Sequence, residues 1–138
     1  MHHEPQPQQE IEELHNFFQS WFNGSIVQSE ADFARVTAVL KPSFILIGPD
    51  GQLSDYATVI GWIRSGYGSR PGFRLWTEAI IVRQQQAGLW LATYVEGQEI
   101  NGMLNRRLSS AFFCEQPSAP RGLAWLHVHE TWLPRLAV

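Results

Sequence analysis

The chain has 138 residues, of which 44% are hydrophobic and 17% are charged, and these values are typical of one globular domain. Its formal net charge of −3 gives no electrostatic reason to bind nucleic acid or an anionic membrane, so neither is an expected partner. The sequence holds no run of about 20 apolar residues, so we expect no membrane-spanning helix.

The single cysteine, Cys114, excludes an intrachain disulfide and fits a reducing, cytoplasmic location. Residues 1–8 are rich in proline and glutamine, and we expect them to form a disordered tail without a signal peptide. The remaining residues, 9–138, are expected to form a single domain.

Helical periodicity and capping signals predict two helices near the N-terminus. The first is expected over residues 9–23. Its apolar stripe comprises Ile11, Leu14, Phe18 and Trp21 or Phe22. The second is expected to begin at Ser29, which has capping-box spacing to Asp32. It should end before Pro42, because the residue before a proline avoids helical backbone.

A short apolar strand is predicted at residues 44–47, followed by a turn at Pro49-Asp50-Gly51. A third helix is expected over about residues 55–65, with Ser54 as its cap. The glycine-rich segment 65–72 should be a flexible loop.

The rest of the chain is predicted to be β-structure. Four long strands are expected at residues 73–85, 89–100, 105–116 and 123–133. Their short connections favour an antiparallel meander. The order of elements predicts an α+β fold, in which a curved antiparallel sheet wraps on three N-terminal helices and encloses a pocket.

The last strand contains the stretch WLHVHETWL, residues 125–133. Because side chains alternate along a strand, Trp125, His127 and His129 should share one face. Glu130 should lie on the other face. We favour a hydrogen-bonded pocket or interface role for the histidines, and a histidine general base is the catalytic alternative.

A His-x-His pair can also supply two ligands to zinc or iron. A third ligand would have to come from elsewhere, for instance from Glu96 or Glu78, and Glu130 points the wrong way. We therefore predict no metal and no cofactor.

Alternation on the strand 89–100 gives a second group on one face: Trp90, Ala92, Tyr94, Glu96 and Gln98. A buried glutamate has a raised pKa and can serve as a general base. The structural alternative for Glu96 is a salt bridge to Arg107 or Arg74.

The third group is Arg107, Ser109, Ala111 and Phe113, which share a face of the strand 105–116. An inward Arg107 would favour an anionic ligand such as a carboxylate, and a cross-strand charge pair is the alternative. Four of the six tryptophans are expected to line an apolar cavity, or else to lie in the core or a dimer interface: Trp21, Trp62, Trp76 and Trp90.

Two segments resemble a known superfamily. They are FILIGPDGQLSDYATVIGWI, residues 44–63, and the pattern Trp125-x-x-Val128-His129. Both resemble the nuclear transport factor 2-like superfamily with its cystatin-like cone, which includes the SnoaL-like polyketide cyclases. The last strand is similar to that of the association domain of calcium/calmodulin-dependent protein kinase II. In that pattern His127 replaces an isoleucine or asparagine, and Thr131 replaces a second histidine.

The resemblance implies a cone-shaped pocket, with Arg107 facing into it, and a homodimer formed through the outer sheet face. We expect the domain to bind a small apolar or carboxylate-bearing molecule. A cofactor-independent isomerase, dehydratase or cyclase is one alternative, and an oligomerisation module is another.

The expected ligand-binding residues are Trp62, Trp76, Trp90, Tyr94, Glu96, Arg107, Ser109, His127 and His129. For the enzymatic alternative the candidates are Glu96, His129 and Tyr94. In particular, we expect Glu96 and His129 to point into one cavity.

Overall fold

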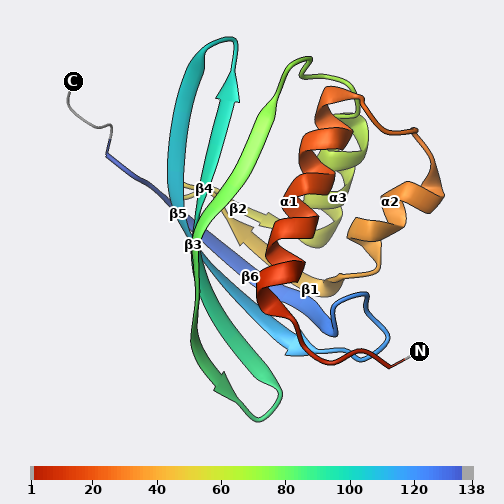
Figure 1. Cartoon of the computed structure of the whole chain (residues 1–138), viewed down its shortest axis with the longest axis vertical. Helices are drawn as coiled ribbons and strands as arrows, with labels where there is room; N and C mark the ends of the chain where they lie inside the picture. The colour runs from red at the N-terminus through yellow and green to blue at the C-terminus, as the bar shows by residue number, and fades with distance from the viewer. Residues whose placement is uncertain (1, 135–138) are drawn as a thin grey trace.

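A computed structural model describes residues 2–134 of the chain, and within them it contains three helices and six strands. The elements are α1 (Pro7–Asn23), α2 (Glu30–Thr37), β1 (Leu40–Ile47), β2 (Leu53–Asp55), α3 (Tyr56–Ser65), β3 (Arg74–Gln86), β4 (Leu89–Ile100), β5 (Met103–Glu115) and β6 (Leu123–Trp132). All three helices lie on one side of a strongly curved sheet (Figure 1). The predicted α+β architecture is confirmed.

The sheet has the strand order β2-β1-β6-β5-β4-β3. The last four strands form the predicted antiparallel meander. The sequence did not predict that β1 pairs in parallel with β6, nor that the short strand β2 extends the sheet beyond β1. Parallel partners are far apart along the chain, so no turn signal marks them.

Helix α1 begins at Pro7, where a missing backbone N–H costs nothing because the first turn has no acceptor for it. The residues before it, expected to form a tail, lie against the loop between β5 and β6. The backbone N–H of His3 donates to the carbonyl of Pro117, and that of Gln6 donates to the carbonyl of Arg121, both at 2.9 Å.

Helix α2 has the predicted cap, since the Ser29 hydroxyl accepts the Asp32 backbone N–H at 3.1 Å. The strand that follows starts at Leu40, four residues before the predicted start at residue 44. Pro42 lies inside β1, at the point where the pairing with β6 is irregular between Leu40 and Ile45. A proline is tolerated there because no ladder hydrogen bond needs its N–H.

The cap of helix α3 is Asp55 rather than Ser54. The Asp55 carboxylate accepts the backbone N–H of Thr58 at 2.9 Å. Hydrogen bonding with the backbone and the side chain of Thr58 lowers the pKa of Asp55. Ser54 instead lies in β2, where it is paired with Leu46. Both residues are common caps, so the sequence alone could not decide between them.

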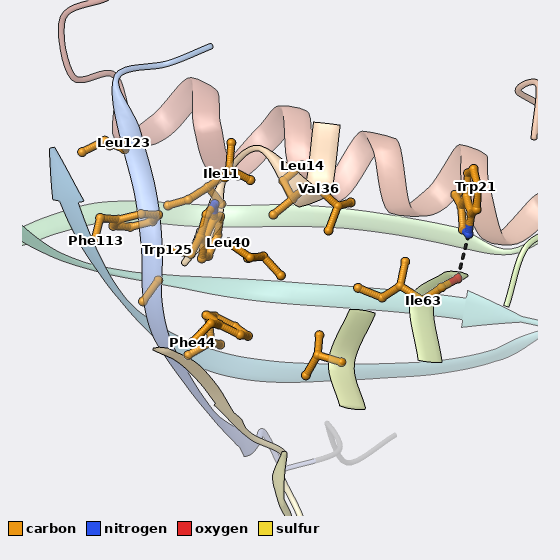
Figure 2. Close-up of a cluster of buried hydrophobic side chains, with 14 of the residues drawn as sticks. Ile11, Leu14, Trp21, Val36, Leu40, Phe44, Ile63, Phe113, Leu123 and Trp125 are labelled. Carbon is orange, nitrogen blue, oxygen red and sulfur yellow. Dashed lines mark hydrogen bonds between the residues drawn. The ribbon is translucent and has the colours of Figure 1, made fainter. Parts of the chain in front are cut away.

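The core lies between α1, α3 and the sheet (Figure 2). Ile11, Leu14 and Trp21 of the predicted helical stripe are buried. The Trp21 indole N–H donates to the carbonyl of Ile63 at 2.7 Å, which ties α1 to α3.

Strand β6 contains a β-bulge that overturns the predicted alternation. Phe112 of β5 is paired with His127, but the next residue, Phe113, is paired with Trp125. Leu126 is therefore an extra residue without a partner on β5. As a result Trp125 points inward and packs on Phe113, with a ring-centroid distance of 4.5 Å, while His127 points outward.

Within residues 2–134, none of the helices is both long enough and apolar enough to cross a membrane.

Candidate functional site

A cavity of about 120 Å³ lies between the helices and the inner face of the sheet. Most of its wall is apolar and comes from α1, α3, β1 and β3. This part includes Leu14, Phe18, Phe22, Leu46, Val59, Ile63 and Leu75. One end of the cavity is polar and comes from α1 and the strands β4, β5 and β6. This end comprises His15, Tyr94, Glu96, Gln98, Arg107 and Glu130.

The buried imidazole of His15, on α1, connects the helix to the sheet. Its Nε2 lies 2.9 Å from the Oε1 of Glu96, and its Nδ1 lies 2.7 Å from the carbonyl oxygen of Ile11. When Glu96 is ionised both partners are acceptors, and a cationic imidazole can donate to both of them. Burial lowers the pKa of His15, but the hydrogen bond and the charge of Glu96 outweigh it and raise the pKa above its usual value.

Glu96, on β4, is an anion held by three neighbours. Its second oxygen accepts from the Gln98 amide at 2.6 Å and lies 3.5 Å from the Nε of Arg107. Burial raises the pKa of this carboxyl, but His15 and Arg107 together outweigh burial and lower it. The salt-bridge alternative for Glu96 thus fits with Arg107 as the partner. Arg74 pairs with Glu99 instead, at 3.5 Å.

Glu130, on β6, is the second carboxyl of the polar end. Its Oε1 lies 3.2 Å from Nη1 of Arg107. Burial, and then the negative charge of Glu96, raise the pKa of Glu130 to about 7, and Arg107 offsets them only in part. We call His15, Glu96, Arg107 and Glu130 the buried charge network.

Two of the buried polar atoms on the inward face of β5 have no hydrogen-bond partner in the described part of the chain. The Nε of Arg107 and the hydroxyl of Ser109 are buried and have no hydrogen-bond partner among the described residues. Ser109 is paired across the strands with Tyr94, whose ring lines the cavity. Burial raises the pKa of Tyr94 well above its usual value, so its phenol stays neutral.

The structure brings together only some of the residues predicted to bind a ligand. Tyr94, Glu96, Arg107 and Trp62 line the cavity, although Trp62 is 51% exposed. Ser109 is fully buried on the same inward face of β5 as Arg107, but it does not line the cavity.

The other predicted tryptophans lie elsewhere. The Trp76 ring covers Gly97, where an added Cβ would meet it at 2.3 Å, and its indole N–H donates to Glu78. The indole N–H of Trp90 donates to Glu115. This pair lies at the other end of strand β4 from Gly97, which Trp76 covers.

The prediction that His129 and Glu96 share a cavity is wrong. Because of the bulge at Leu126, Val128 and Glu130 point into the cavity, whereas His129 is exposed. His127 also lies outside the cavity wall, and the two imidazole centroids are 6.5 Å apart.

Within residues 2–134, no group of three or more His, Cys, Asp or Glu side chains is arranged to hold a metal ion. His127 and His129 therefore lack a third ligand from the described part of the chain.

Sequence reasoning missed His15 and Glu130. A signal for His15 was present, since His15, Phe18 and Phe22 follow helical spacing and share the apolar side of α1. No local signal marks Glu130, because its inward direction depends on the unforeseen bulge.

Comparison with known sequences gives the family. The model of the sucrose-6-phosphate phosphohydrolase C-terminal family matches residues 7–134. The chain belongs to this family. Sucrose-phosphatase 1 of Nicotiana tabacum is 28% identical over 133 residues, which cover 92% of this chain but 31% of that protein. This chain thus spans about a third of the length of that relative.

Solved structures confirm the predicted fold. A nuclear transport factor 2-like protein of unknown function from Pseudomonas aeruginosa has a TM-score of 0.83 at 22% identity, covering 93% of this chain and 98% of that one. The hub of calcium/calmodulin-dependent kinase II from S. rosetta has a TM-score of 0.64 at 13% identity, covering 74% of this chain and 82% of that one. At these identities the likeness shows the fold alone.

The titration of Glu130 should be visible in the stability of the protein. Its pKa is higher in the folded state than in the unfolded state, so the stability it contributes is lost as the pH rises from about 4.5 to about 7. The free energy of unfolding should fall between pH 5 and pH 8 by about 2 kcal/mol more in the wild type than in Glu130→Gln. Urea denaturation at both pH values measures this difference.

The raised pKa of His15 acts in the same direction, and its contribution is also lost as the pH rises. His15 is present in both proteins, but the charge of Glu130 helps to raise its pKa, so the difference measures Glu130 together with this coupling. An equal fall in both proteins would show that Glu130 has an ordinary pKa.

Proposed function

We propose that this domain binds a small molecule in the cavity, with the apolar body of the ligand against the helices and an uncharged hydrogen-bonding end at the buried charge network. The observation that carries the proposal is the cavity itself, which combines an apolar wall with convergent polar groups of shifted pKa. This combination is typical of ligand sites.

The size of the cavity limits the ligand. Its volume is about 120 Å³, and an apolar cavity of roughly 150 Å³ in another protein holds a benzene molecule. A single ring or a short branched chain therefore fits inside, and any larger part of the ligand must extend past the exposed ring of Trp62.

The charges favour a neutral group at the polar end. Arg107 already lies between Glu96 and Glu130, at 3.5 and 3.2 Å. A ligand carboxylate placed there would lie beside two protein carboxylates, and like charges at such distances repel. A hydroxyl or amide can instead donate to Glu130 and accept from Arg107.

The relatives are sucrose-phosphatases, so hydroxyl-rich ligands belong among the first to be tested. In a longer protein of that kind, this domain would be the part that binds a ligand in its own cavity. The single cysteine Cys114 supports a reducing, cytoplasmic setting for it.

Filling the cavity should weaken binding without unfolding the protein. Val128 is buried and lines the cavity, so the phenyl ring of Val128→Phe occupies the space of the ligand. Ligand-observed NMR with 4-methylphenol and benzyl alcohol should detect binding to the wild type, and glucose is included as a hydroxyl-rich probe. Affinity should drop at least tenfold in the variant, with unchanged circular dichroism.

The matched control is Val82→Phe, which makes the same change at an exposed position of β3. It should bind like the wild type. Equal binding by Val128→Phe would show that the probes bind elsewhere and would contradict the proposal.

An enzymatic role is a second candidate, and Glu130 is the observation that favours it. A carboxyl with a pKa of about 7 can both accept and release a proton near neutral pH, as a general acid–base group must. His129 cannot take this role in the cavity because it lies on the other face of the sheet.

For this candidate, the measurement is exchange of ligand carbon-bound hydrogen with D₂O, followed by NMR. Glu130→Gln should slow the exchange at least a hundredfold, whereas His129→Ala should leave it unchanged. Exchange that survives in Glu130→Gln would rule out Glu130 as the base.

Self-association is a third candidate, and the outer face of the sheet supports it. This face carries Leu108, which is 43% exposed, and by strand alternation it also carries Phe112, His127 and His129. One of the solved relatives is described as a hub. We propose that two copies of the chain associate through this face.

Leu108→Glu should convert the dimer to a monomer, because the carboxylate would be buried against apolar surface. Light scattering after size-exclusion chromatography measures the mass. Leu53→Glu, at an exposed leucine of β2, should stay dimeric. A monomeric wild type would disprove this candidate and leave ligand binding untouched.

A further inference from the structure

One arginine differs from the others in the described part of the chain. Six arginines lie within 4 Å of a glutamate oxygen: Arg35, Arg64, Arg74, Arg106, Arg107 and Arg121. Arg83 donates to the hydroxyl of Thr93. Among residues 2–134, no carboxylate lies within that distance of Arg70, and no side-chain hydrogen bond involves its guanidinium.

Arg70 lies in the loop between α3 and β3, and its side chain forms part of the cavity wall. The guanidinium carbon is 5.1 Å from the ring centroid of Phe22, 5.2 Å from that of Phe73 and 5.9 Å from that of Trp62. Trp62 is half exposed, so Arg70 and these three rings lie on the side of the cavity that opens to solvent.

The loop that carries Arg70 is fixed to the end of α1. The backbone N–H of Arg70 donates to the carbonyl of Phe22 at 2.9 Å, and that of Gly68 donates to the carbonyl of Trp21 at 3.0 Å. Phe73 in turn donates to the carbonyl of Arg70 at 3.1 Å. The guanidinium is therefore preorganised by its backbone and by the rings around it.

A guanidinium held by aromatic rings keeps its N–H donors available. Arginine has five donors in a planar fork, and this fork matches a carboxylate or a phosphate in a bidentate manner. Arg107 cannot bind an anion in this way, because Glu96 and Glu130 already neutralise its charge. The two arginines of the cavity wall thus differ in their charge balance.

We propose that the ligand of the cavity is an amphiphilic anion, whose carboxylate or phosphate is bound by Arg70 at the open side while its ring or chain fills the apolar interior. This inference rests on the proposed ligand-binding function. It names the class of ligand and moves the anion site from Arg107, where the sequence suggested it, to Arg70.

The test compares matched probes that differ in charge. 4-Hydroxyphenylacetate and phenyl phosphate each carry an oxyanion, whereas 2-(4-hydroxyphenyl)ethanol is a neutral counterpart of the first. Isothermal titration calorimetry of the full chain should show that the wild type binds each anion at least tenfold more tightly than the alcohol. Binding by only one of the two anions tells carboxylate from phosphate and supports the proposal for that group.

The variants assign the preference to Arg70. Arg70→Gln should remove the preference and leave the affinity for the alcohol unchanged, and Arg70→Lys should restore only part of it because an ammonium lacks the fork. The control is Arg74→Gln, at an arginine that stacks on Trp76 and pairs with Glu99. It should keep the preference of the wild type.

The outcomes separate the two proposals. If the alcohol binds as tightly as the anions, or if Arg70→Gln keeps the preference, the assignment to Arg70 is wrong while ligand binding stands. If the wild type binds none of the three probes, and none of the neutral ligands tested against Val128→Phe, both proposals fail together.

Discussion

The hydrogen bond between His15 and Glu96 is the contact on which the cavity depends. It joins the middle of α1 to the centre of β4 at 2.9 Å and is almost completely buried. Two charges removed from water are tolerated only when each has a partner, and deleting one partner of a buried pair costs about 3–5 kcal/mol. The pair therefore fixes how closely α1 approaches the sheet, and so fixes the space that is left between them.

A second buried carboxylate shows what a purely structural charge looks like. Glu10 is fully buried, and it accepts two hydrogen bonds from Arg35 and one from the indole of Trp125. Every donor comes from the protein, and Glu10 does not belong to the cavity wall. In the buried charge network, by contrast, the Nε of Arg107 is left without a hydrogen-bond partner. Glu10 is thus part of a structural ion pair away from the cavity, whereas the buried charge network forms part of the cavity wall.

Much of the fold could be predicted from the sequence because it depends on local signals. The strand 89–100 has the predicted bounds, since alternation and the turn glycines around it are both local. The inward face of β5 also follows from alternation, and Ser109 is buried as that pattern requires. The parallel pairing of β1 with β6 could not be foreseen, because it depends on a contact between distant segments.

The candidate site was harder to predict, because one extra residue changes which side chains of β6 face inward. Without a bulge, alternation from the inward Trp125 would place His127 and His129 on the inner face of the sheet as well. With Leu126 inserted, Glu130 points inward instead. A bulge has no reliable signature in a single sequence, so the identity of the inward residue follows only from the pairing of β6 with β5.

The same bulge explains how one strand can serve two purposes. On the inner face it gives the cavity a carboxyl, Glu130, whose protonation responds to pH near neutrality. On the outer face it presents His127 and His129 beside Phe112, on the surface we assign to a second copy of the chain. Ligand binding and association would then use opposite faces of the same sheet. A substitution on one face can be chosen without touching the chemistry of the other, so the two functions can be separated by experiment.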